Sequence, residues 1–122
     1  MSNALNWFEI PVTDLARAKR FYGSVLQAEL REESMSGRKL AIFPYQKDGV
    51  GGALLEDAAP VPGAQGAVIY LDAGDDLDGA IARVAAGGGK VVLGKTRISA
   101  DIGSIAHFLD TEGNRVALHS PQ

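Results

Sequence analysis

The chain has 122 residues, 46% of them hydrophobic and 22% charged, which is ordinary for one globular domain with a buried core. The net charge is −3 and the 12 basic residues are scattered, so the sequence argues against nucleic acid or an anionic membrane surface as a partner. The absence of cysteine excludes disulfides, thiolate zinc sites and cysteine nucleophiles.

Two further features bear on location. No apolar run approaches the about 20 residues that a membrane-spanning helix needs. The first residues, Met1-Ser2-Asn3-Ala4, do not show the basic region followed by an apolar stretch that a signal peptide has. We therefore expect a cytoplasmic protein.

The first predicted strand, residues 7–12, carries a carboxylate. Its residues alternate between two faces, with Phe8, Ile10 and Val12 on one and Trp7, Glu9 and Pro11 on the other. A strand covered on both faces would be apolar on both, so the face of Glu9 must meet water or a ligand.

A helix is predicted directly after this strand, over residues 14–26. Asp14 can cap its start, and apolar residues recur near the helical period at Leu15, Ala18, Phe21, Tyr22 and Leu26. We expect the apolar face of the preceding strand to pack against this helix.

Three strand-like runs complete the first half, at residues 27–33, 38–45 and 51–56. Lys47-Asp48-Gly49 forms the turn before the last of them. The run GVGG at 49–52 lacks a following Lys-Ser/Thr and helix, so it predicts a bend or a thin wall and not a phosphate loop. Residues 57–66, DAAPVPGAQG, are predicted to be a linker.

The second half follows the same order of elements. A strand at 66–72 precedes a helix that begins at Asp76-Leu77 and ends at glycines, and strands are predicted at about 89–97, 103–110 and 114–119. The Asp-Leu pairs are 62 residues apart, and the Ala-Leu pairs of the last strands are 64 apart. The chain is therefore predicted to be α+β, with two βαβββ modules at about 5–56 and 67–120.

This repeat, with PVTDLARAKRFYGSVL in the first half and AHFLDTEGNRVALHS at the end, resembles the vicinal oxygen chelate superfamily of glyoxalase I, bleomycin-resistance proteins and extradiol dioxygenases. The resemblance covers nearly the whole chain. It implies a single glyoxalase-like domain, in which curved mixed sheets of the paired modules enclose a cavity, and it implies a homodimer. It does not fix one activity.

The resemblance also assigns four positions to metal ligands in metal-using relatives. Carried over to this chain, they are Trp7, Ala53, Val68 and Ala117, and none of these side chains can bind a metal. A shifted site is the alternative, because residues two apart on a strand share a face. Glu9 and His119 then hold a weakly bound divalent metal together with water.

The ligand-binding cavity that the resemblance implies is then expected to be lined by Trp7, Glu9, Tyr70, Arg115 and His119. Each residue has a plainer alternative: a solvated or paired carboxylate for Glu9, core packing for the aromatic residues, and surface exposure for Arg115 and His119. His107, in the apolar run SIAHFLD, is predicted to be a hydrogen-bonded structural residue whose face a bulge could change.

Two functions follow from these residues. The first is a protein without cofactor that binds a small cationic or aromatic molecule, as sequestering resistance proteins of the superfamily do. The alternative is a lyase or isomerase related to lactoylglutathione lyase, which uses Glu9 or the shifted metal to move a proton. The missing ligands favour the binding protein.

Overall fold

The structure is a computed structural model that describes residues 3–35, 37–56 and 61–122. Part of the predicted linker, residues 57–60, therefore lies outside the described residues. The elements in chain order are β1 (Trp7–Val12), α1 (Leu15–Leu26), β2 (Arg31–Met35), β3 (Arg38–Ile42), β4 (Gly51–Glu56), β5 (Tyr70–Asp72), α2 (Leu77–Ala86), β6 (Lys90–Ser99), β7 (Gly103–Leu109) and β8 (Arg115–Ser120).

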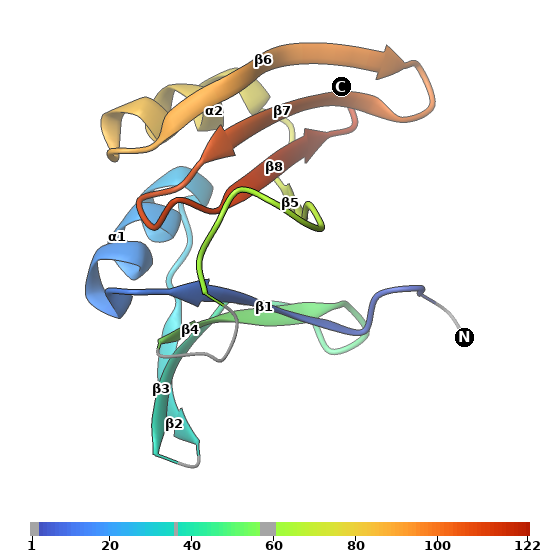
Figure 1. Ribbon diagram of the computed structural model, residues 1–122. Helices are drawn as coiled ribbons and strands as arrows, with labels where there is room; N and C mark the ends of the chain where they lie inside the picture. The colour runs from blue at the N-terminus through green and yellow to red at the C-terminus, as the bar shows by residue number, and fades with distance from the viewer. Residues whose placement is uncertain (1–2, 36, 57–60) are drawn as a thin grey trace.

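The strands form two separate four-stranded sheets with the same internal order. The first sheet runs β1-β4-β3-β2 and the second runs β5-β8-β7-β6. In each, the first strand pairs in parallel with the last and the other neighbours are antiparallel, so both sheets are mixed. Figure 1 shows the second sheet above the first, with no closed barrel between them. The predicted α+β fold class is confirmed.

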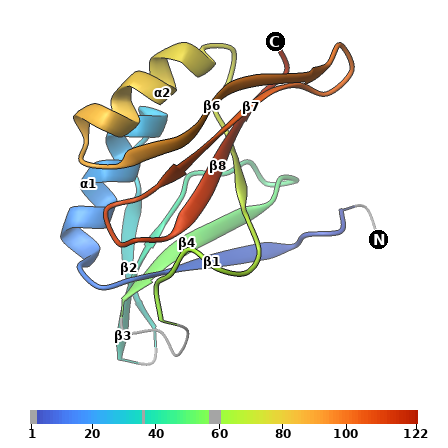
Figure 2. The same ribbon diagram turned by 45° about the horizontal axis from the view of Figure 1, so that its top comes forward.

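The two helices lie beside each other at one end of the sheets, as Figures 1 and 2 both show. α1 contacts both sheets, because Tyr22 meets Phe43 of the first half (ring centroids 5.6 Å apart) and Phe108 of β7 (6.2 Å). The expected packing of β1 on α1 is confirmed, since Ile10 and Val12 are buried in the same cluster as the helix. Burial of each such side chain contributes about 1.5–3 kcal/mol.

Both helices begin and end as their sequences indicate. Asp14 caps α1 by accepting a hydrogen bond from the backbone N–H of Arg17 (3.1 Å), and Asp76 caps α2 through Gly79 (3.0 Å). Gly87 lies at the C-terminal cap of α2. The predicted hairpin turn at 112–114 is present, with Gly113 in the left-handed region at φ 87°.

Some strand boundaries were wrong. Residues 27–30 of the predicted strand 27–33 are not in β2, because Gln27 adopts a left-handed conformation (φ 49°) that ends α1 and turns the chain. β3 ends at Ile42, short of the predicted 45, just before Pro44, which has no N–H for a ladder. β5 begins at Tyr70, not at residue 66, and β6 continues to Ser99.

The turn after β7 binds the start of α1 across the two halves of the chain. Glu112, whose side chain is fully buried, accepts hydrogen bonds from the backbone N–H groups of Thr13 (2.8 Å) and Asp14 (2.9 Å) and from the guanidinium of Arg17 (2.8 Å). Burial by itself raises the pKa of Glu112. The hydrogen bonds from Arg17, Asp14, Thr111 and Thr13 outweigh that effect and lower the pKa to about 2.

This carboxylate predicts a specific dependence of stability on pH. The pKa of Glu112 is lower in the folded chain (about 2) than its ordinary value of 4.5, so its contribution is complete above pH 4.5 and is lost as the pH falls toward 2. We expect Glu112→Gln to reduce the free energy of unfolding by about 2–4 kcal/mol at pH 7, and by less at pH 3, in urea titrations.

The matched control is Glu33→Gln, which removes an ion pair between the exposed side chains of Glu33 and Arg31 (2.9 Å). Such pairs contribute about 0–1 kcal/mol. Equal stability of the two variants at pH 7 would show that Glu112 is not a main link between the halves.

Candidate functional site

Each sheet has one face toward the helices and one opposite face, called its outer face here. In the first sheet Trp7 lies opposite Gly51 and Glu9 opposite Ala53, on the outer face, because their neighbours Ile10 and Val12 point into the core. The Glu9 residue is exposed. A carboxylate is therefore tolerated in β1 because, within one chain, this face meets water.

The outer face of the first sheet carries a pair of exposed aromatic rings. Trp7 and Tyr45 meet edge to face, with centroids 6.0 Å apart and planes at 79°, and they are 40% and 52% exposed. A Cβ at Gly51 would lie 2.5 Å from the ring of Tyr45, so only glycine leaves room for this ring. The prediction that a glycine keeps the wall thin agrees with this contact. Tyr45 was not predicted as a site residue. The glycine at position 51 is the one sequence feature that indicates a close contact here.

On the outer face of the second sheet, three polar residues form a chain of hydrogen bonds. The hydroxyl of Tyr70 is 2.9 Å from Nε2 of His107, and Nε of Arg115 donates to Nδ1 of the same ring at 3.1 Å. Burial lowers the pKa of His107, and the charge of Arg115 lowers it further. His107 is hydrogen-bonded, as expected, but it lies beside two predicted site residues, a position that the sequence could not assign.

His119 of β8 lies on the same outer face, directly opposite Asp72 of β5. Its Nε2 makes a hydrogen bond with the carbonyl oxygen of Ile102, which accepts. Within the described residues, no three His, Asp or Glu side chains are grouped closely enough to hold a metal ion.

Glu9 and Arg115, from different halves, line one cavity of about 310 Å³. Its walls include Pro11, Ile69 and the segment at 61–67. Among the side chains that the structure describes, Glu9 and Arg115 make no ion pair with each other. Two opposite charges are therefore available in one cavity.

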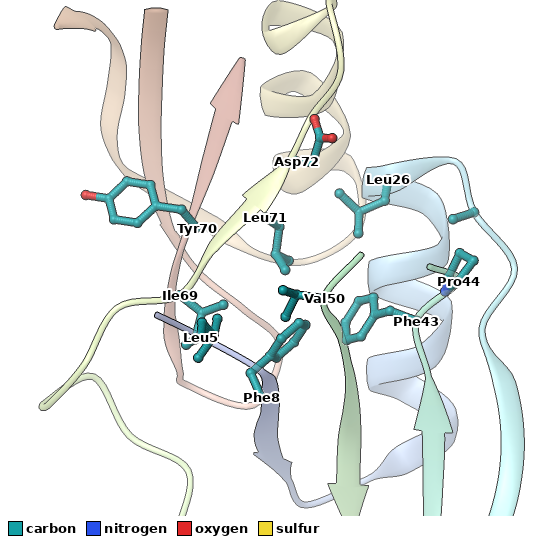
Figure 3. A pocket seen from close by; sticks show the side chains of 11 residues that line it. Leu5, Phe8, Leu26, Phe43, Pro44, Val50, Ile69, Tyr70, Leu71 and Asp72 are labelled. Atoms are coloured by element: carbon teal, nitrogen blue, oxygen red, sulfur yellow. The ribbon is translucent and has the colours of Figure 1, made fainter. Parts of the chain in front are cut away.

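A second cavity, of about 390 Å³, opens between the two sheets and is mostly apolar. Figure 3 shows Phe8, Phe43, Val50, Ile69 and Leu71 gathered around it, while the ring of Tyr70 points away from Leu71. It lies on the helix side of the sheets and contains only Tyr70 of the predicted site residues.

The four positions that the resemblance assigns to metal ligands do not fit a metal ion. Ala53 and Ala117 lie on the outer faces, opposite Glu9 and Tyr70, but a methyl group offers no lone pair. Trp7 has only an indole N–H donor, and Val68 has no polar atom. A metal ion at these four positions would therefore have no side-chain ligand.

Comparison with known proteins was consistent with this geometry. A family model described as the Glyoxalase/Bleomycin resistance protein/Dioxygenase superfamily matches residues 4–118. A search of curated protein sequences gave no match.

Several solved structures share the fold. TnmS3, described as an antibiotic binding protein from Streptomyces sp. CB03234, is 23% identical with a TM-score of 0.72, and the match covers 100% of this chain and 99% of that one. FosX, a fosfomycin resistance protein from Listeria monocytogenes, is 20% identical with a TM-score of 0.71 (98% and 91% covered). A glyoxalase I mutant from Zea mays is 21% identical with a TM-score of 0.72, over 95% of this chain and 45% of that one.

The contact between Gly51 and Tyr45 predicts how the outer face responds to a methyl group. Gly51→Ala must displace the Tyr45 ring from Trp7, since the new Cβ would otherwise lie 2.5 Å from that ring. Trp7 is the only tryptophan, so we expect a shift in the tryptophan emission spectrum. Gly63→Ala is the control, because nothing lies within 4 Å of its Cβ position. An unchanged spectrum in Gly51→Ala would contradict the arrangement.

Proposed function

The chain belongs to the Glyoxalase/Bleomycin resistance protein/Dioxygenase superfamily, and we propose that it binds a small organic molecule without a metal. The ligand is cationic or aromatic and lies against the outer faces of the sheets. Trp7, Glu9, Tyr70, Arg115 and His119 are the residues proposed to line its site.

The exposed aromatic residues carry this proposal. Trp7, Tyr45 and Tyr70 are each at least 40% exposed on the outer faces, where they give up burial in the core. Rigid rings of this kind suit flat organic ligands, and a few charged groups then orient the ligand. Glu9 and Arg115, which share a cavity without pairing, supply such charges.

The similarity to a protein described as antibiotic binding supports the binding of a small molecule. We also propose a homodimer. The outer face of the first sheet carries the exposed rings of Trp7 and Tyr45, and exposed apolar surface of this kind suits a second subunit. Sedimentation of a pure monomer at all concentrations would contradict this part of the proposal.

Trp7 makes the binding proposal directly testable. A panel of aromatic cations, neutral aromatics and aromatic anions is titrated while the emission of Trp7 is recorded. We expect saturable quenching by at least one aromatic compound. If that compound is a cation, Glu9→Gln should weaken its binding about three- to tenfold, whereas Asp78→Asn on α2 should not. Failure of the whole panel to bind would contradict the function.

Metal dependence is tested by thermal melts with Ni²⁺, Mn²⁺, Zn²⁺ and Fe²⁺. A bound metal stabilises the folded chain through linkage, so we expect no rise in Tm. A rise that disappears in Glu9→Gln or His119→Ala would instead support the shifted metal site and the lyase or isomerase alternative.

A further inference from the structure

The chain of hydrogen bonds on the second sheet fixes where its protons lie. The Nε of Arg115 can only donate, so Nδ1 of His107 must be the accepting, unprotonated nitrogen. A neutral imidazole carries one ring proton, which therefore sits on Nε2 and is donated to the hydroxyl oxygen of Tyr70. The lowered pKa of His107 is consistent with a neutral ring at pH 7.

This arrangement leaves hydrogen-bond donors available on the outer face. Because the oxygen of Tyr70 accepts from His107, its own O–H must point elsewhere, and the Tyr70 residue is 49% exposed. Arg115 uses its Nε on His107, and in the described part of the chain its terminal nitrogens make no hydrogen bond.

Two carboxylates on the outer faces, Asp72 and Glu9, do not pair with these donors among the described side chains. Asp72 lies two residues beyond Tyr70 on β5, where its Oδ1 accepts from the backbone N–H of Gly74 (2.8 Å). Glu9 shares a cavity with Arg115, but the structure shows no ion pair between their described side chains. Tyr70 and Arg115 therefore offer an open phenolic donor and an open cation, which match a group that only accepts hydrogen bonds.

We propose that Tyr70 and Arg115 bind an anionic oxygen group of the ligand, a carboxylate or a phosphonate, and that His107 positions both donors. The proposal rests on the proposed function and names the polar group that accompanies the ligand's aromatic part. His107 is a positioning residue, because both of its ring nitrogens are occupied by Arg115 and Tyr70.

The test uses benzoate and phenylphosphonate as probes, with benzamide and benzylammonium as the neutral and cationic analogues. Amide ¹H–¹⁵N spectra of the full chain are followed during titration at pH 7. We expect saturable changes at Tyr70, His107 and Arg115 with at least one anion, and binding at least about tenfold weaker for both analogues. The tighter of the two anions identifies the oxygen group.

Variants test whether anion binding depends on the hydrogen bonds that join Tyr70, His107 and Arg115, and not on general packing. Tyr70→Phe and Arg115→Gln should each weaken binding of the anion about three- to tenfold. The control Arg31→Gln, which removes an exposed arginine on β2 of the other sheet, should not. His107→Phe keeps a ring but should remove the preference for benzoate over benzamide. The ¹⁵N shifts of the wild-type His107 ring should show a protonated Nε2 and an unprotonated Nδ1.

Four results would overturn the inference: equal binding of benzamide and benzoate, anion binding that maps elsewhere, a protonated Nδ1, or Tyr70→Phe and Arg115→Gln that bind anions as the wild type does. If another compound bound the outer faces while neither anion did, this inference would fail and the proposed function would stand. If no compound of any charge bound, both would fail.

Discussion

The carboxylate of Glu112 at the start of α1 is the interaction on which the arrangement of the two halves depends. Its oxygens accept from the backbone N–H groups of Thr13 and Asp14, while Glu56 at the end of β4 accepts from that of Leu15 (2.9 Å). Negative charge at a helix N-terminus is favourable, because the unpaired N–H groups and the helix dipole are both satisfied. One turn in the second half thereby holds a helix of the first half.

Asp110, at the start of the same turn, makes a second contact with α1, inside the core. Asp110 accepts a hydrogen bond from the buried hydroxyl of Tyr22 (2.6 Å) and also from the backbone N–H groups of Glu112 and Asn114 (2.8 Å each). Because Tyr22 packs on Phe43 and Phe108, this bond fixes α1 between the two sheets. With the helices on the inner side, the outer faces are left for water, a ligand or a partner.

Much of the fold could be predicted from the sequence because local chemistry specifies it. The alternation in β1 identified which residues enter the core, Asp14 and Asp76 identified two helix starts, and Gly113 identified a hairpin. The boundaries that failed depend on single backbone conformations. Gln27 adopts a left-handed conformation that cannot be predicted from a glutamine side chain, so residues 27–30 were predicted to be part of a strand.

The candidate site was less predictable because it depends on register and on contacts across strands. β6 and β7 pair with three irregularities, so the face of His107 could not be read from alternation, and only its pairing with Ala117 in β8 fixes it. The hydrogen bonds that join Tyr70, His107 and Arg115 link residues up to 37 positions apart. Tyr45 escaped notice for a similar reason, since its place depends on Gly51 in the neighbouring strand.

We expect the outer sheet faces, and not the apolar cavity between the sheets, to hold the ligand. A crystal structure after soaking with a mixture of small aromatic fragments tests it most directly. We expect density against Trp7 and Glu9 or against Tyr70 and Arg115. Density confined to the cavity lined by Phe8, Phe43 and Leu71 would contradict it.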